Sequence, residues 1–75
     1  MLYQVQVKSD KQRVYRKLSV KMRSIESLKS DLESYVIMYA EDNQLNWHTV
    51  SAQIIDQNGN VVFERLSNIR SLKVN

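Results

Sequence analysis

One stretch constrains the fold of this chain more than any other, SIESLKSDLESYVIMYAED from Ser24 to Asp42. Its apolar residues recur every three or four positions, which is the spacing of one face of an α-helix. Ser24 is a favoured N-cap residue, and Glu26 places a negative charge in the first turn, where the helix dipole stabilises it. We therefore predict an amphipathic helix that the rest of the chain must cover. Its apolar face would consist of Ile25, Leu28, Leu32, Tyr35, Val36, Tyr39 and Ala40.

Two apolar residues near the end of this helix, Ile37 and Met38, lie outside the apolar face. Either the following loop folds back over them, or they belong to a surface that contacts a partner. Both interpretations are kept, and the two residues are candidates for a protein interface.

The residues before the helix predict a β-hairpin. Residues 2–8 alternate between apolar and polar side chains, which is the period-two pattern of a half-buried strand. A polar turn at 9–12 leads to a second alternating run, Val14–Arg23. Arg16 interrupts the apolar side of that run, so we place it near the sheet edge or the turn.

A third strand is predicted after the helix, at Thr49–Asp56. The loop at 41–46 would let Leu45 close the end of the core, and His48 would lie at the surface just before the strand. The residues of this strand that share one face are Val50, Ala52 and Ile54.

The dipeptide Asn58-Gly59 contains the only glycine of the chain and predicts a second hairpin. Asn-Gly favours a two-residue type I′ turn, because that turn needs a positive φ at both central residues. The fourth strand would then be Val61–Leu66. The predicted pairs across this hairpin are Ile54 with Phe63 and Ile55 with Val62.

Together these elements predict an α+β fold of order β-β-α-β-β, a four-stranded antiparallel sheet with one helix packed on one face, in one domain (1–75). The C-terminal tail allows two structures: Ile69 and Leu72 suit a helical turn, whereas Leu72 and Val74 suit a short strand. The layout resembles that of ubiquitin-like β-grasp domains, which a strand at 71–74 would complete. The chain lacks the terminal Gly-Gly of conjugated modifiers, so the resemblance implies a layout and no modifier activity.

A chain of 75 residues holds one small core, which contributes a stability of about 3–5 kcal/mol. Domains of this size often rely on disulfides, a metal ion or a second subunit. The absence of cysteine excludes disulfides, and one histidine supplies too few ligands for a transition-metal site. Self-association into a homodimer is therefore expected.

No set of residues in the sequence suits catalysis. His48 is the only histidine, and no nucleophile–base motif surrounds it. Glu41 and Asp42 are adjacent, so at a helix end their carboxylates diverge. A single glycine cannot form a phosphate-binding loop or a dinucleotide fingerprint. We predict that the protein is not an enzyme and has neither a cofactor nor a metal site.

The charges are segregated along the chain. Residues 1–23 have a net charge of +6, and residues 24–48 have a net charge of −4. Basic side chains on the outer face of the first hairpin, beside a ring that can stack on a base, are typical of nucleic-acid binding. The alternatives are that these residues form a solvated face that protects the sheet edge from aggregation, or that they bind an acidic protein. The candidates are Lys8, Tyr15, Lys17, Lys21 and Arg23.

A sheet that carries one helix leaves its other face open. Ile55, Val62 and Leu66 alternate with the core residues of the second hairpin, so we expect them to form an apolar strip on that open face. A homodimer could pair two such strips or two strand edges. The alternative is that the tail covers the strip through Ile69 and Leu72.

We therefore expect a small non-catalytic binding or regulatory protein, of the kind frequent among bacterial and phage-encoded regulators and inhibitors, which occupies the surface of a protein partner and forms a homodimer. A nucleic-acid-binding module that uses the basic hairpin is the alternative. No run of about 20 apolar residues predicts a membrane span, and the alternating N-terminus is unlike a signal peptide. A cytoplasmic location is the expectation.

Overall fold

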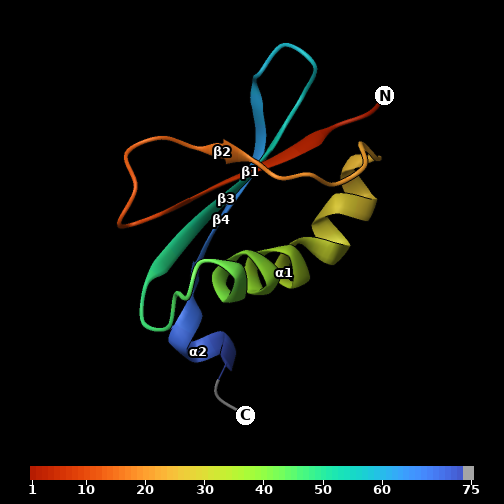
Figure 1. The fold of residues 1–75 in the computed structure, drawn as a ribbon. Helices are drawn as coiled ribbons and strands as arrows, with labels where there is room; N and C mark the ends of the chain where they lie inside the picture. Colours follow the sequence, from red (N-terminus) through yellow and green to blue (C-terminus); the bar gives the residue numbers. More distant parts are fainter. Residues whose placement is uncertain (74–75) are drawn as a thin grey trace.

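The computed structural model describes residues 1–73, which form a four-stranded antiparallel sheet with one long helix packed against one face (Figure 1). The elements are β1 (Gln4–Ser9), β2 (Arg16–Lys17), α1 (Ile25–Asp42), β3 (Thr49–Ile55), β4 (Val61–Asn68) and α2 (Ile69–Lys73). The strands lie in the order β2-β1-β3-β4, so β1 and β3 are central while β2 and β4 are the edges. This arrangement confirms the predicted α+β fold class.

The helix α1 begins where the sequence predicts. The Ser24 hydroxyl caps it by accepting a hydrogen bond from the backbone N–H of Ser27 at 3.3 Å. The predicted apolar face packs against the sheet, with Ile25 and Tyr35 half-buried at its margins. The residues of this face that are buried are Leu28, Leu32, Val36, Tyr39 and Ala40.

The hydrophobic core lies between α1 and the two central strands. Leu45 closes one end of it, as predicted, and the backbone N–H of Leu45 donates to the carbonyl oxygen of Ala40 at 2.8 Å. Alternate residues of the central strands point into this core because successive side chains of a strand lie on opposite faces. The strand residues in the core are Val5, Val7, Val50, Ala52 and Ile54.

The C-terminal tail packs on the same side of the sheet as α1. Ile69, the first residue of α2, is fully buried in the core, and Leu72 packs against it. Residues 69–73 are helical, which confirms the helical alternative for the tail. The alternative strand is therefore wrong at residues 71–73, and Val74 lies outside the described residues. The described tail therefore contributes to the core and leaves the opposite face of the sheet open.

The first hairpin is shorter than predicted. The predicted strand Val14–Arg23 is wrong over most of its length. Arg16 and Lys17 pair with β1, and this pairing ends with a hydrogen bond from the N–H of Leu18 to the carbonyl oxygen of Val5 at 3.0 Å. Arg16 does lie at the sheet edge, as expected. The chain then leaves the sheet to reach the start of α1. Just before the helix begins, one isolated bridge joins Arg23 to Tyr3, the residue that precedes β1. The apolar side chains of this connection pack against the core without a strand ladder: Leu18 and Val20.

The turn of the second hairpin is not of type I′. The backbone N–H of Asp56 donates to the carbonyl oxygen of Asn60 at 2.9 Å, so the loop has three residues rather than two. Gly59 has a φ of 84°, whereas Asn58 does not have the positive φ that a type I′ turn requires. The carboxylate of Asp56 explains the longer loop, because it accepts hydrogen bonds from the N–H groups of Asn58 and Asn60, each at 2.9 Å.

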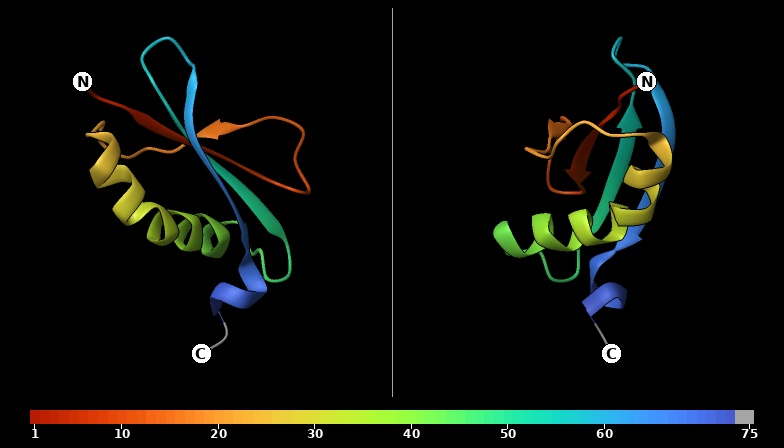
Figure 2. Two further views of the ribbon diagram at one scale, coloured as in Figure 1. Left: turned by 180° about the vertical axis from the view of Figure 1, so that it is seen from behind. Right: turned by 90° about the vertical axis from the view of Figure 1, so that its right-hand side faces the viewer.

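The longer loop changes the register of the hairpin at one point. Ile54 faces Phe63, as predicted, but Ile55 faces Val61, and the predicted partner Val62 is the extra residue of a β-bulge. Both views of Figure 2 show the tip of this hairpin projecting beyond the helical layer, so this end of β4 has little of the fold around it.

Candidate functional site

The face of the sheet opposite α1, called the open face, has a polar centre. The side-chain amide of Gln6 on β1 donates to the amide oxygen of Gln53 on β3 at 2.6 Å. The amide of Gln53 in turn donates to the carboxylate of Glu64 on β4. Gln53 is buried in spite of its position on this face. The centre of the open face is therefore a satisfied hydrogen-bond network rather than an apolar surface.

The apolar residues of the open face gather on β4. Val61 is 48% exposed, Val62 41% and Leu66 69%. Glu64 lies between the last two on the strand, so the predicted strip is divided. Ile55, expected to be part of the strip, is only 3% exposed because the bulge sets two valines against it. Alternation along the strand did not predict the exposure of Val61. That exposure results from the bulge, which depends on the length of the loop.

The outer side of β4 is unpaired. This strand hydrogen-bonds to β3 on one side, and the described residues 1–73 place no strand on the other. In such an edge strand, alternate backbone N–H and C=O groups point away from the sheet and can pair with another chain. β4 therefore combines exposed apolar side chains with a free backbone edge.

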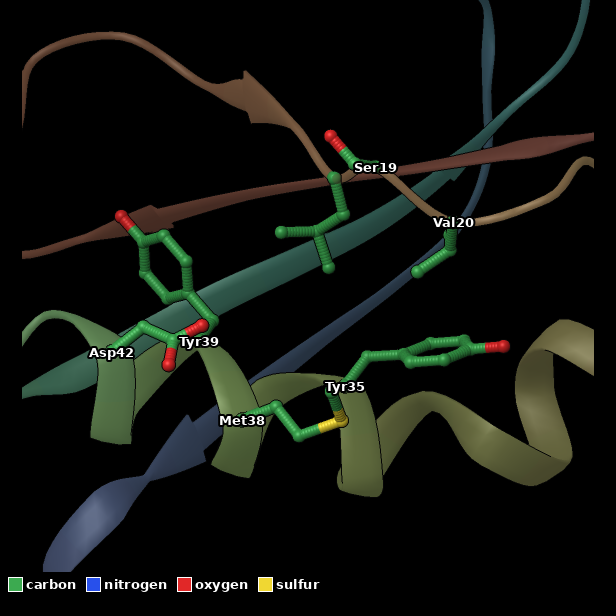
Figure 3. Close-up of a pocket in the computed structure, with 7 residues that line it drawn as sticks. Ser19, Val20, Tyr35, Met38, Tyr39 and Asp42 are labelled. Carbon is green, nitrogen blue, oxygen red and sulfur yellow. The ribbon is translucent and has the colours of Figure 1, made fainter.

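A second apolar feature is a groove of about 180 Å³ between α1 and the connection that precedes it, drawn in Figure 3. Met38, which is 59% exposed, lines it from α1, and Val20 lines it from the connection. The loop after α1 therefore does not cover Met38, whereas Ile37 is half-buried. The groove has room for one or two apolar side chains. Its lining residues are Leu18, Ser19, Val20, Tyr35, Met38, Tyr39 and Asp42.

Three of the basic-hairpin candidates do meet on the open face. The ammonium group of Lys8 lies 5.9 Å from the centre of the Tyr15 ring, within reach of a cation–π contact. The hydroxyl of Tyr15 is hydrogen-bonded to the hydroxyl of Ser51 at 2.6 Å, which fixes the ring against the sheet. Lys17 pairs with Gln6 on the same face. Lys21 is exposed but lies outside any strand.

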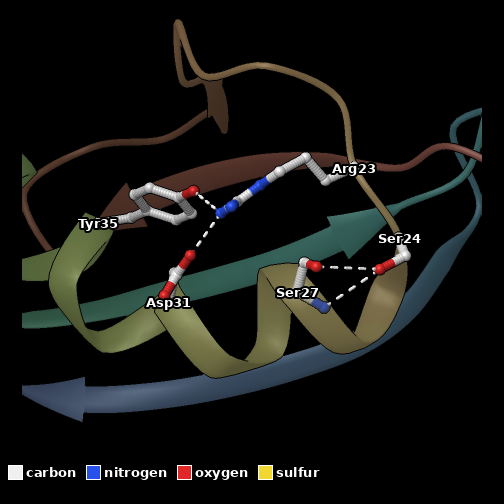
Figure 4. Close-up of polar contacts among 5 residues, drawn as sticks. All are labelled: Arg23, Ser24, Ser27, Asp31 and Tyr35. Carbon is white, nitrogen blue, oxygen red and sulfur yellow. Dashed lines mark hydrogen bonds and ion pairs between the residues drawn. The ribbon is translucent and has the colours of Figure 1, made fainter.

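Arg23 does not join this group. Its guanidinium donates to the carboxylate of Asp31 at 2.6 Å and also to the hydroxyl of Tyr35, both on α1 (Figure 4). The hydrogen bond to Asp31 is the main cause that raises the pKa of Arg23. The expected row of Lys17, Lys21 and Arg23 along one strand is therefore wrong. Arg23 instead fastens the chain before α1 to the helix, a long-range pairing that alternation cannot reveal.

His48 is buried rather than at the surface, which corrects the expectation from sequence. The exposed ring of Trp47 stacks on the imidazole, with 4.0 Å between ring centres and 19° between planes. Neither ring nitrogen has a hydrogen-bond partner among the residues that the structure describes. The sequence did contain a signal for burial, because His48 has the same parity as Val50 and Ile54, which face the core.

Among residues 1–73 there is no group of three or more His, Cys, Asp and Glu side chains that could hold a metal ion. None of the helices in this part of the chain is long and apolar enough to cross a membrane. No family model matches the chain, and no curated protein and no solved structure matches it significantly.

Proposed function

We propose that this chain is a small non-catalytic protein-binding protein that contacts its partner through β4. The observation that carries the proposal is the combination of a free strand edge with three exposed apolar side chains, those of Val61, Val62 and Leu66. Exposed apolar area marks interaction surfaces, and strand addition to a free edge is a recurrent mode of protein recognition.

The composition of β4 supports this proposal. Soluble proteins block their edge strands with lysine, proline, very short strands or a covering element. β4 spans eight residues and contains no lysine and no proline. Its only charged residues are Glu64, which is bonded to Gln53, and Arg65, whose guanidinium lies 5.8 Å from the Phe63 ring. Beyond the bulge at Val62, the edge therefore has no lysine, no proline and, among the described residues, no covering strand.

We place this activity among small cytoplasmic regulators or inhibitors of a bacterium or a phage. Chains of this size without a catalytic motif are frequent in that class, and an absence of cysteine is compatible with a reducing compartment. The protein would act by occupying a surface that its partner needs for another contact.

A pull-down with nuclease-treated lysate tests the proposal. Wild-type protein is compared with Val62→Glu and with Val14→Glu, a matched control because Val14 is also an exposed valine but lies in the loop of the first hairpin. Partners that depend on β4 should be retained by wild-type protein and the control and lost with Val62→Glu. Equal recovery with all three proteins would contradict the proposal.

A nucleic-acid-binding function is the second candidate, and the position of Lys8 over the Tyr15 ring beside Lys17 favours it. Such binding should weaken linearly with salt on a double-logarithmic plot, and Lys8→Glu with Lys17→Glu should flatten the slope. Fluorescence anisotropy with single-stranded oligonucleotides measures this. The absence of binding at low salt would eliminate the candidate.

A further inference from the structure

The edge of β4 is complementary to itself. We propose that β4 pairs with β4 of a second copy, antiparallel, with Glu64 opposite Glu64 at the two-fold axis. This inference starts from the same free edge as the proposed function but goes beyond it, because it assigns to that edge a second molecule of the same chain. Two sheets would thereby join into one, with both α1 helices on the same side.

The symmetry of such a pair restricts its register. A two-fold axis perpendicular to the sheet keeps the two open faces together, so the paired residues must point to the same face. With the axis at Glu64, Val62 of each copy faces Leu66 of the other on the open face. On the helical face, Phe63 faces Arg65 of the other copy. The exposed Val62, at the bulge, and the exposed Leu66 then become apolar partners, and the half-buried Phe63 gains a cation–π partner.

The neighbouring registers lack this match. An axis at Phe63 sets Val62 against Glu64, and an axis at Arg65 sets Leu66 against Glu64 and brings two arginines together. The proposed register has one unfavourable feature, the two glutamates at its centre. Each of them already accepts a hydrogen bond from Gln53 of its own sheet, which holds the carboxylates on the open face.

The dimer also meets a need of the single chain. A domain of 75 residues has a small core, and binding to a second folded copy stabilises the folded state by mass action. The opposite edge cannot serve in this way, because β2 has only two residues, both charged and exposed. Self-association is therefore directed to β4.

Single-cysteine variants test the register, because the native chain contains no cysteine. Opposed residues of an antiparallel pair have Cα atoms about 4.5–5.5 Å apart, which is within the range for a disulfide. Glu64→Cys should therefore give a disulfide-linked dimer on mild oxidation. Val62→Cys alone should not, since its two copies lie about 13 Å apart along the strand.

A mixture of two variants tests the same register with the glutamates in place. Val62→Cys mixed with a size-tagged Leu66→Cys should give the mixed disulfide, and neither variant should cross-link to itself. Cross-linking of Phe63→Cys or Arg65→Cys in preference to Glu64→Cys would overturn the register. Absence of a cross-link at every position of β4 would overturn the pairing itself.

Sedimentation equilibrium measures the affinity of the dimer. Val62→Glu should raise the dissociation constant at least about tenfold by opposing a charge to Leu66. Glu64→Gln should lower it about two- to fivefold by removing the like charges. Val14→Glu, at an exposed valine in the loop of the first hairpin, should leave it unchanged. Circular dichroism confirms that each variant is folded.

The outcomes separate this inference from the proposed function. A wild-type monomer at high concentration overturns the self-pairing, yet the function stands if Val62→Glu still loses its partners in the pull-down. A cross-linked dimer of the proposed register whose Val62→Glu variant retains every partner confirms the self-pairing and contradicts the function.

Discussion

The two hairpins of this protein differ more than their sequences suggest. Both show apolar–polar alternation, yet β2 extends over two residues and β4 over eight. The difference lies in what each strand must do next. The chain after β2 must cross to the helical layer to begin α1 at Ile25, whereas β4 continues along β3 and turns into the core only at Ile69. Alternation thus shows which residues are able to form a strand, and the path of the chain decides how many do.

The two edges of the sheet also differ in their protection. Arg16 and Lys17 make β2 a short, charged edge, which resists pairing with another chain. The edge at β4 is long and presents Val62 and Leu66 to solvent. One edge of the sheet is therefore short and charged, and the other is long and exposes apolar side chains. Four predictions test whether the two hairpins also differ in their contributions to stability.

The largest effect is expected in the core of the second hairpin. Ile54 is fully buried opposite Phe63, so Ile54→Ala should lower the free energy of unfolding by about 2–5 kcal/mol. Leu18→Ala, at a half-buried residue directly after β2 of the first hairpin, should lower it by roughly 1 kcal/mol. Urea unfolding followed by circular dichroism measures both. Equal losses would show that the two hairpins contribute alike to stability.

The next effect concerns His48, which leads into the second hairpin. A buried polar group without a hydrogen-bond partner lowers stability, so His48→Leu should raise the free energy of unfolding by about 1 kcal/mol. Trp47→Ala is the companion variant to His48→Leu. Removal of the indole uncovers the imidazole, so that water can reach its two ring nitrogens. A clear loss of stability in His48→Leu would mean that the ring nitrogens have a role in the folded protein.

A smaller change is expected at the turn of the second hairpin. A Cβ atom at Gly59 would meet no heavy atom within 4 Å, so Gly59→Ala should lower stability only through its positive φ, by about 1 kcal/mol. Lys11→Ala in the turn of the first hairpin should change it by less than about 0.5 kcal/mol. Thermal unfolding of both variants at one pH compares the turns, and an unaffected Gly59→Ala would indicate a loop without a fixed conformation.

The smallest effect is the pH dependence of the same turn. The N–H of Asn60 is the main cause that lowers the pKa of Asp56, and the N–H of Asn58 adds to it. A lowered folded-state pKa contributes stability above the ordinary pKa, which is lost as the pH falls through the folded-state value. Wild-type protein should therefore exceed Asp56→Asn in urea midpoint at pH 7, and the gap should narrow as the pH falls below about 4. A gap that stays constant as the pH is lowered from 5 to 2.5 would argue against this carboxylate.

Local signals predicted part of the candidate site. The alternation of the second hairpin predicted Val62 and Leu66 on the open face. The predicted Ile54–Phe63 pair is correct because the bulge at Val62 offsets the extra residue of the loop. The bulge escaped prediction because it depends on hydrogen bonds from the loop to Asp56. The exposure of Val61 and the burial of Ile55 both result from that bulge.

The sequence by itself determined the features that depend on near neighbours: the helix from Ser24 onward, its buried face, the two hairpins and the order of the elements. These follow from hydrogen bonds and periodicities within a few residues of one another. Only the tertiary structure decided the end of β2, the attachment of Arg23 to α1, the burial of His48 and the free edge of β4. Those depend on groups far apart in the chain, whose meeting is set by how the helix and sheet pack.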